Sequence, residues 1–509
     1  MTPTFDPSVG GDDAPDHAAP PFALDDRLPA SRDLIAGRRC VPGLVLDGTL
    51  DDPNTGLPLA PRCATRPEDV DRALAAAHAV HEQGSWAAAG VEGRAEVLLR
   101  LADELTARTE SMALAESLNT GIVLGVTTAI AGGCADQVRG LVEQLRAAGT
   151  VTELPGRGRG GPVRLHRDPW GPAVVLAPWN APSPTAVGTS AAALAAGCPV
   201  ILKPSEWAPG SSDLFAEAVV AAGVPSGVCQ LVHGDRRTGA QLAGDPRVRA
   251  VAMTGGLAGG RVVAWSAAVN FTRLQLELSG NNPVIVRSDA DLAVTAAALA
   301  AGMTKLNGQW CEAPGRVFVP AERHDELVEA LLAELSGLTI GSSLAPSTDL
   351  GPISHWRHLT RLTEQVDDAV AQGAHALTPA MELPDQGWFM APTVIVGLDP
   401  QDAVDEIFGP VITVHPVASD EAAVAAANAT PDGLAGYVFG RDLEAALDLG
   451  ARLRGGEIKI NGTSLLDLTD ASHQSFWGTS GYGGHGAGEA LEFFRGNRIV
   501  GVDNPDVPI

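Results

Sequence analysis

The chain has 509 residues, which is more than one compact core accommodates, so we expect two or more domains. Its 61 acidic and 35 basic side chains give a formal charge of −26, and such a surface repels nucleic acid and anionic membranes. No apolar stretch approaches the roughly 20 residues that a membrane-spanning helix needs. Partners of both kinds are therefore excluded, and we expect a soluble globular protein.

The N-terminal segment is rich in Pro, Asp and Ala and lacks the basic-then-apolar order of a signal peptide. We interpret residues 1–30 as a mobile leader and expect a cytoplasmic protein. The six cysteines are scattered, without a CxxC pair or the spacing of metal ligands. This pattern is typical of reduced thiols, and it predicts no metal site.

Two helices are predicted near the start of the folded part. Thr65-Arg66-Pro67-Glu68 has the form of a capping box ahead of an Ala-rich run that extends to about Glu82. A second helix is expected from Arg94 to Arg108, because its apolar residues fall on one face. The Gly- and Arg-rich stretch from Val151 to Arg167 is compatible with either a linker or a protruding hairpin.

From Pro172 onward, short apolar strands alternate with Ala-rich helices. The strands are expected at 172–177, 199–202, 228–232 and 248–253, and the helices at 186–196, 211–222 and 259–268. Buried strands that alternate with helices predict a parallel, doubly wound sheet, whose ligands lie beyond the carboxyl ends of the strands. A second such pattern runs from about residue 283 past residue 410, with helices at 291–306 and 324–335.

Three residues have side chains suited to catalysis. Cys311 precedes a predicted strand at 317–319, and a cysteine is a strong nucleophile when its pKa is lowered or a base is near. Glu277 lies between two leucines, and apolar surroundings raise the pKa of a carboxyl toward that of a general base. Asn180 closes the first strand, where its amide can donate to an oxyanion. The structural alternatives are a buried cysteine, a solvated glutamate and a capping asparagine.

Two further strands end in segments suited to a nucleotide. Lys203-Pro204-Ser205-Glu206 places a lysine and an acid three residues apart, which suits ribose hydroxyls, although a surface ion pair is the alternative. Met253-Thr254-Gly255-Gly256 is followed by two more glycines, and such residues let backbone amides approach a pyrophosphate. No convincing GxGxxG motif follows a strand.

Taken together and in this order, these segments resemble the aldehyde dehydrogenase superfamily. The resemblance extends from about Gly48 to Val500 and depends on six motifs: Pro178-Trp179-Asn180, Lys203-Pro204-Ser205-Glu206, Thr254-Gly255, Glu277-Leu278-x-Gly280, Gly308-Gln309-x-Cys311 and Glu406-Ile407-Phe408-Gly409-Pro410. It implies an α/β fold with two doubly wound domains and a small β oligomerisation arm. The implied cofactor domain is 31–150 and 168–277, the catalytic domain 278–475, and the arm 151–167 and 487–509. This favours the hairpin over the linker for residues 151–167.

The resemblance also implies a role for each matching residue. Cys311 matches the nucleophile, Glu277 the general base, and Asn180 the oxyanion-hole amide beside the backbone N–H of Cys311. Lys203 and Glu206 match ligands of the adenosine ribose, while Glu406 matches a ligand of the nicotinamide ribose and Phe408 packs near that ring. The other implied cofactor residues are Pro178, Trp179, Ser205, Thr254, Gly255, Gly256 and Leu278.

The implied reaction oxidises a small-molecule aldehyde to its acid with NAD(P). Cys311 forms a thiohemiacetal and then a thioester, which water activated by Glu277 hydrolyses. A carboxylate at Glu206 accepts a hydrogen bond from a ribose 2′-hydroxyl and repels a 2′-phosphate, so we expect NAD in preference to NADP. The alternatives are a CoA-acylating enzyme and a catalytically silent scaffold. The resemblance also implies a homodimer or homotetramer.

The sequence departs from the family pattern at several positions. Gly256 stands where a serine is common, and Gly484-His485 where Arg-Glu is common. The residues expected to line the substrate pocket are Ala181, Thr185 and Gly188, which are small where bulky apolar residues are frequent, together with Trp310 and Glu312 beside the nucleophile. We therefore hypothesise a roomy, partly polar pocket for a large or polar aldehyde.

Overall fold

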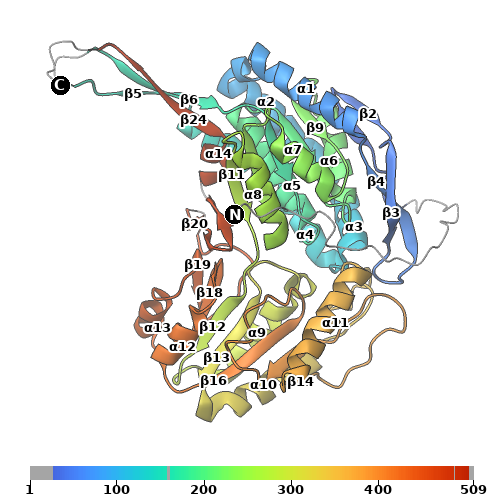
Figure 1. Cartoon of the computed structure of the whole chain (residues 1–509), viewed down its shortest axis with the longest axis vertical. Coiled ribbons are helices and arrows are strands. Elements are labelled where there is room, and N and C mark those ends of the chain that lie inside the picture. Colours follow the sequence, from blue (N-terminus) through green and yellow to red (C-terminus); the bar gives the residue numbers. More distant parts are fainter. Residues whose placement is uncertain (1–26, 158–160, 470, 487, 504–509) are drawn as a thin grey trace, which may run out of the picture.

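The computed structural model of the chain describes residues 27–157, 161–469, 471–486 and 488–503. The leader predicted at residues 1–30 thus falls almost wholly outside the described residues. Two helix-covered sheets are stacked along the long axis, and a narrow β ribbon projects from the upper one (Figure 1). The predicted α/β fold with two doubly wound parts and a small β ribbon is confirmed.

The larger sheet has eight strands in the order β2-β1-β9-β8-β7-β10-β11-β22. Its five central strands run parallel, and the edge strands β1, β2 and β22 are antiparallel to their neighbours. The strand bounds are β1 Asp33–Ile35, β2 Arg38–Cys40, β7 Ala173–Leu176, β8 Val200–Lys203, β9 Cys229–Leu231, β10 Ala250–Thr254, β11 Arg273–Glu277 and β22 Gly481–Tyr482.

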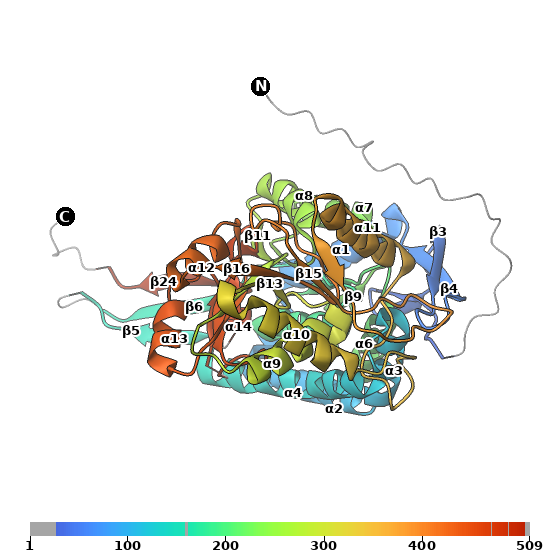
Figure 2. The ribbon, with the colours of Figure 1, turned by 90° about the horizontal axis from the view of Figure 1, so that it is seen from below.

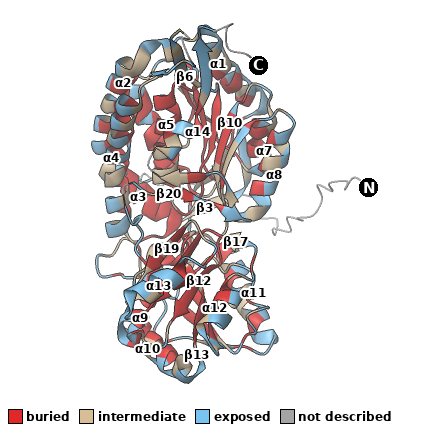
Figure 3. Cartoon of the chain, turned by 90° about the vertical axis from the view of Figure 1, so that its left-hand side faces the viewer, coloured by how far each residue is buried: buried red, intermediate tan, exposed pale blue. Residues whose placement is uncertain are grey.

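Helices cover both faces of this sheet because its central strands are apolar on both sides. One face packs on α2 Gly90–Thr106, α3 Thr109–Thr120, α4 Leu124–Ala148, α5 Pro182–Ala196 and α6 Gly210–Ala221. The other packs on α1 Pro67–Gln83, α7 Arg236–Gly244 and α8 Leu257–Ala268. Figure 3 shows the strands as buried and the outer helix surfaces as exposed.

The second sheet has seven strands in the order β14-β15-β16-β13-β12-β18-β19, and only the edge strand β14 is antiparallel. Its bounds are β12 Asn282–Val286, β13 Pro314–Pro320, β14 His375–Leu377, β15 Thr393–Val396, β16 Val411–Val417, β18 Ala435–Phe439 and β19 Glu457–Ile460. Its helices are α9 Leu292–Thr304, α10 His324–Ser336, α11 Trp356–Ala371, α12 Asp420–Ala427 and α13 Leu443–Gly450.

The projecting ribbon consists of β5 Val151–Leu154, β6 Val163–Pro169 and β24 Arg495–Gly501, all antiparallel (Figures 1 and 2). The hairpin interpretation of residues 151–167 is therefore correct. Of the arm segment predicted at 487–509, the described residues 488–503 are only partly ribbon, because α14 Glu489–Phe493 packs against α5 in the first core. Smaller elements are β3 Leu44–Asp51, β4 Pro58–Ala64, β17 Asp432–Gly433, β20 His473–Ser475, β21 Trp477–Gly478 and β23 Gly484–Gly486.

The capping box predicted at Thr65 is wrong. Arg66 is the N-cap of α1 and makes no side-chain capping bond. The Thr65 hydroxyl instead donates to Asp33 at 2.7 Å, because this buried carboxylate needs hydrogen-bond donors. Within the described part of the chain, no helix is both long and apolar enough to cross a bilayer.

Candidate active site

A thiol and a carboxylate meet between the two sheets. Glu277 is the last residue of β11, and Cys311 lies in the loop between α9 and β13. The Sγ atom of Cys311 donates to Oε1 of Glu277 at 3.1 Å, and the Thr254 hydroxyl donates to Oε2 at 3.5 Å. Both residues are partly exposed. The structure thus brings together the predicted nucleophile and the predicted base.

The electrostatics place the proton on sulfur. Burial, followed by the charges of Glu277 and Glu312, raises the pKa of Cys311 well above its usual value. Burial also raises the pKa of Glu277, but the His485 imidazole, the Cys311 thiol and the Thr254 hydroxyl together lower it more. The expectation of a raised pKa at Glu277 is therefore wrong, because it considered the flanking leucines and not His485. The pair is a neutral thiol beside a proton acceptor.

The loop that carries the nucleophile has an unusual backbone. Leu306, Asn307 and Gly308 all have positive φ angles, of 47°, 59° and 76°. The Asn307 amide donates to the carbonyls of Gly121 and Pro352 at 2.8 and 2.9 Å. A Cβ atom on Gly308 would lie 2.2 Å from the backbone of Gly409 and Pro410, so only glycine allows this close approach. The nucleophile loop is therefore pressed against the segment that follows Glu406.

Two asparagines hold this loop from either side. Asn180 donates to the carbonyl of Gln309 at 2.9 Å, two residues before the nucleophile. Asn282 donates to the carbonyls of Cys311 and Ala313 at 2.8 and 2.9 Å. Sequence reasoning gave Asn282 no role. Its position at the start of a strand buried throughout was the available signal, because a buried amide needs partners.

The segments expected to bind the cofactor lie along one edge of the larger sheet. Strands β7, β8 and β10 are neighbours, so Pro178–Asn180, Lys203–Glu206 and Thr254–Gly256 follow adjacent carboxyl ends. Nζ of Lys203 donates to the carbonyls of Pro204 and Gly234, at 2.6 and 2.8 Å, and burial lowers its pKa. Ser205 is buried and its hydroxyl accepts from the backbone N–H of Trp207 at 3.3 Å, while Glu206 is half-buried.

The start of α8 suits a phosphate group. Gly256 is the N-cap of this 12-residue helix, and no side chain of the described residues caps it. A Cβ atom at Gly256 would have nothing within 4 Å, so there is room beside the first-turn amides. The backbone N–H of Gly255 donates to the carbonyl of Glu277 at 3.0 Å, and Leu278 packs closely against Gly260. These residues fit the pyrophosphate of a dinucleotide.

Glu406, Phe408 and Trp179 lie at the same edge. Oε1 of Glu406 accepts from the backbone N–H of Gly280 at 3.1 Å, and burial raises the pKa of this carboxyl to about 7. The rings of Trp179 and Phe408 meet edge to face at 5.5 Å. His358, which sequence reasoning missed, lies 4.9 Å from the Trp179 ring and donates to the Phe408 carbonyl at 2.7 Å.

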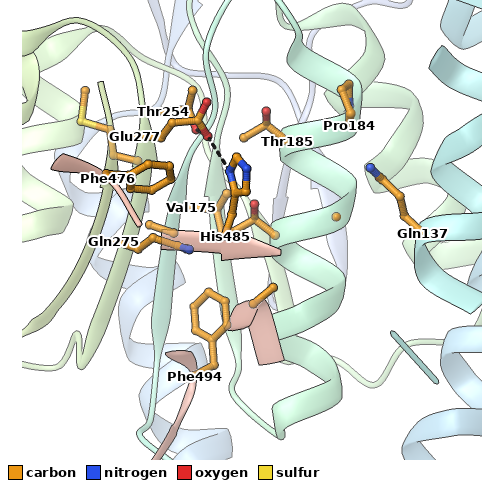
Figure 4. Close-up of a pocket in the computed structure, with 15 residues that line it drawn as sticks. Gln137, Val175, Pro184, Thr185, Thr254, Gln275, Glu277, Phe476, His485 and Phe494 are labelled. Atoms are coloured by element: carbon orange, nitrogen blue, oxygen red, sulfur yellow. Dashed lines mark hydrogen bonds and ion pairs between the residues drawn. The ribbon is translucent and has the colours of Figure 1, made fainter. Parts of the chain in front are cut away.

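A cavity of about 280 Å³ lies beside Glu277, and residues of α5, β7, β10 and β11 line it (Figure 4). Its polar walls include Gln137, Thr185, Gln275 and His485, and its apolar walls include Phe476 and Phe494. Gly188 also lines it, as does Thr185, so two of the five predicted pocket residues lie at its wall.

The other three predicted pocket residues lie outside this wall. The indole of Trp310 is buried and donates to the Gly302 carbonyl at 2.9 Å, in a cluster with Ile122 and Leu306. Glu312 forms an ion pair with Lys459, whose Nζ lies 3.1 Å from its carboxylate. Ala181 precedes α5 and is partly exposed.

Comparison with known proteins agrees with this geometry. The sequence model of the Aldehyde dehydrogenase family matches residues 49–500. Geranial dehydrogenase of Castellaniella defragrans is 33% identical over 79% of this chain and 84% of its own. Human cytosolic 10-formyltetrahydrofolate dehydrogenase is 32% identical over 79% of this chain, which spans only 45% of that protein. Betaine aldehyde dehydrogenase of Staphylococcus aureus, solved with NAD⁺, superposes with a TM-score of 0.89 at 27% identity, covering 94% of this chain and 96% of its own. The chain therefore belongs to the aldehyde dehydrogenase family, and it is an oxidoreductase that acts on aldehydes with a nicotinamide cofactor.

Proposed function

We propose that this enzyme oxidises a large or polar aldehyde to its carboxylic acid with NAD, using Cys311 as nucleophile, Glu277 as base and Asn180 as oxyanion donor. The observation that carries the proposal is the hydrogen bond of 3.1 Å from the Cys311 thiol to Glu277. A neutral thiol needs a base to become nucleophilic, and this carboxylate is within reach of its proton.

The chemistry of the chain's own residues proceeds in two halves. Glu277 first accepts the thiol proton, and the sulfur of Cys311 bonds to the aldehyde carbon. One amide hydrogen of Asn180 is used by the Gln309 carbonyl, and the other remains for the developing oxyanion. A bound nicotinamide supplies the hydride acceptor. Glu277 next releases the thiol proton to solvent and then deprotonates the water that attacks the thioester. The C–S bond breaks as the acid leaves, and the Cys311 sulfur regains a proton from Glu277.

Replacement of the base tests this scheme without the cofactor. A p-nitrophenyl ester acylates the cysteine directly, so release of nitrophenolate and the later hydrolysis can be followed separately. In Glu277→Gln we expect hydrolysis of the acyl-enzyme to slow by about 100-fold or more. The exposed Glu322→Gln is the matched control. Equal hydrolysis rates in wild type and Glu277→Gln would remove the base from the scheme.

The cofactor residues favour NAD. Lys203, Glu206, Glu406 and Phe408 would hold the two ribose halves, and Gly255–Gly256 the pyrophosphate. Because a carboxylate at Glu206 repels a 2′-phosphate, we expect kcat/KM to be at least about tenfold higher with NAD than with NADP. Glu206→Gln should reduce that preference. Comparable kcat/KM values with both cofactors in the wild type would contradict the assignment.

The cavity beside Glu277 supports a large or polar substrate. Gly188 and Thr185 leave space there, and Gln137 and Gln275 offer hydrogen bonds. A side chain at Gly188 would grow toward Gln137, whose Oε1 lies 3.1 Å from the Cβ position. We expect Gly188→Leu to lower kcat/KM for bulky aldehydes and to spare short ones. Gly125→Leu, on the exposed side of α4, is the control. A wild-type preference for short aliphatic aldehydes would contradict this proposal.

We also propose a cytoplasmic homodimer or homotetramer. All six cysteines, each in the described ranges, are unpaired, which suits a reducing compartment. Large apolar side chains are exposed along the ribbon, at Val151, Ile499 and Val500, and just beyond α8, at Val269 and Phe271. Exposed apolar patches of this kind favour contact with a second subunit.

The predicted division into a cofactor domain, a catalytic domain and an arm is also part of our proposal. We change it at one point: α14 belongs to the cofactor domain, because it packs in the core of the larger sheet.

A further inference from the structure

The Gly-rich segment near the C-terminus runs along β11 and brings a histidine to the base. Gly481 pairs with Glu277 in the β11–β22 ladder, and a Cβ atom there would lie 1.7 Å from the Leu276 carbonyl oxygen. The Gln275 side chain donates to the Gly484 carbonyl. Because both contacts hold this segment against β11, the next residue, His485, has a defined place beside Glu277.

The imidazole faces the oxygen of Glu277 that the thiol does not use. Nδ1 of His485 lies 3.9 Å from Oε2, whereas the Cys311 thiol donates to Oε1. The ring meets Phe476 edge to face at 5.3 Å, which limits its rotation. Figure 4 shows His485 directed at Glu277 from the cavity side. The carboxylate is thus held between a thiol and an imidazole that come from different segments.

Acidic groups surround this imidazole from three elements. Glu277 lies on β11, Glu312 follows the nucleophile, and Asp467 lies in the segment between β19 and β20. Burial lowers the pKa of His485, but its close contact with Glu277 and the negative charges of Glu277, Asp467 and Glu312 raise it to about 8. His485 is therefore a cation near neutral pH, and it contributes to the lowered pKa of Glu277.

We propose that His485 is a positioning residue for Glu277: its imidazolium keeps the carboxylate ionised and directed at the reacting thiol and water. The proposal rests on the base role proposed for Glu277. Two consequences follow for hydrolysis of the acyl-enzyme. Loss of the cation makes Glu277 easier to protonate, so the acid limb of the rate profile moves to higher pH. Deprotonation of His485 at alkaline pH releases the contact, so the rate falls there.

Two substitutions separate the charge from the shape of this side chain. His485→Gln removes the charge, and His485→Lys keeps a cation to well above pH 8, because the ordinary pKa of lysine is about 10.4. We would form the acetyl-enzyme with p-nitrophenyl acetate and measure its hydrolysis in single turnovers. The series would run from about pH 4 to about pH 10, which covers roughly the range in which carboxyl and imidazole groups titrate. In His485→Gln we expect the acid limb to move up by about one pH unit. In His485→Lys we expect the acid limb to stay in place and the wild-type inflection near pH 8 to vanish.

Glu277→Gln distinguishes failure of this inference from failure of the base role. If Glu277→Gln hydrolyses the acyl-enzyme as fast as wild type, the base role fails and the His485 proposal falls with it. If Glu277→Gln is slow but His485→Gln keeps the wild-type profile, only the His485 proposal is overturned. The double variant should be no slower than Glu277→Gln, because His485 acts through that carboxylate. A further loss in the double variant would assign His485 a separate role.

Should His485→Gln fail to fold, the profile of His485→Lys alone decides: an unchanged inflection near pH 8 overturns the proposal.

Discussion

Glu277 illustrates how a single side chain can be held for two proton transfers. One of its oxygens accepts from the Cys311 thiol at 3.1 Å, and the other faces Thr254 and His485 at 3.5 and 3.9 Å. The first contact places it for deprotonating sulfur, and the second set keeps it ionised. Because the pKa of Glu277 is lowered, its carboxylate form persists into the acidic range, and activity should be lost only as the pH falls through that pKa.

Gly308 offers a test of how the nucleophile loop is held. In Gly308→Ala a methyl group would meet the Gly409 and Pro410 backbone at 2.2 Å in a left-handed conformation. We expect this change to destabilise the protein by about 3 kcal/mol or more, and to change the rate at which iodoacetamide alkylates Cys311. Thermal unfolding midpoints and alkylation rates measure the two effects.

Gly84→Ala is the matched control, because Gly84 also has a positive φ of 65° but a Cβ atom there meets nothing within 4 Å. It carries only the strain of the left-handed backbone, about 1 kcal/mol. Equal losses in the two variants would show that close packing at Gly308 is unimportant.

Sequence reasoning at this scale succeeded where a residue's chemistry is visible in its own segment. Cys311, Glu277 and Asn180 each stand in a distinctive short motif, and the structure places all three around one loop. His358 was missed, and His485 was noted only as a departure from the family pattern, because their importance depends on partners far along the chain. Glu277 and His485 are more than 200 positions apart in the sequence, so no local pattern shows that their side chains meet.

Among the elements, the four strands β7, β8, β9 and β10 of the larger sheet were predicted within about two residues. Their continuous apolar character is a strong local signal, and it reflects burial on both faces. The helices α3 and α4, β11 and most strands of the second sheet were given no bounds. The edge strands β1, β2 and β22 and the short helix α7 were not predicted either. These last four elements are two to nine residues long, and β2, β22 and α7 are mostly polar or Gly-rich, so their conformation depends on the neighbouring strand or core.

A buried ion cluster joins the strand β1 and the helix α6 to the segment that follows β9. His233 follows β9, with Nδ1 at 2.9 Å from Asp33 of β1 and Nε2 at 3.3 Å from Asp213 of α6. Burial lowers the pKa of His233, but the two carboxylates raise it by more, and the result is a pKa of about 9. Because the folded-state pKa is raised, the stabilisation is fully present below the unfolded pKa near 6.5 and is lost as the pH rises through about 9.

We therefore expect His233→Gln to destabilise the protein strongly at pH 6, on the order of 3 kcal/mol, and less at pH near 9. Thermal unfolding midpoints of both proteins, measured at one scan rate across this range, test the trend. His375→Gln, an exposed histidine on β14, should show a constant and small difference. A gap between wild type and His233→Gln that widens as the pH rises would contradict the sign of the effect.

At the scale of the whole molecule, the ribbon and the end of α8 present apolar surface that a single chain leaves exposed. Phe271 is 94% exposed and has a positive φ of 53°, which is unfavourable for an aromatic residue. Such a residue is more readily explained by contact with another subunit than by the stability of one chain. Composition alone predicted the acidic surface, but it could not place these exposed apolar residues, because they lie on separate segments.

Phe271→Asn tests the assembly without endangering the fold. Asparagine tolerates a left-handed backbone better than phenylalanine, so the monomer should be at least as stable. We expect sedimentation velocity to show a shift toward smaller species in this variant. Val370→Asn, at an exposed apolar position on α11, is the control. An unchanged assembly in Phe271→Asn would exclude this patch from the subunit contact.

The most direct test of the central assignment is the appearance of NADH on a mixed aldehyde panel, with wild type beside Cys311→Ala. We expect wild type to oxidise at least one large or polar aldehyde. Cys311→Ala should form no NADH and should keep the wild-type thermal midpoint within a few degrees (about 1 kcal/mol of stability). NADH formation by Cys311→Ala at a rate comparable to wild type would contradict the nucleophile assignment and the mechanism built on it.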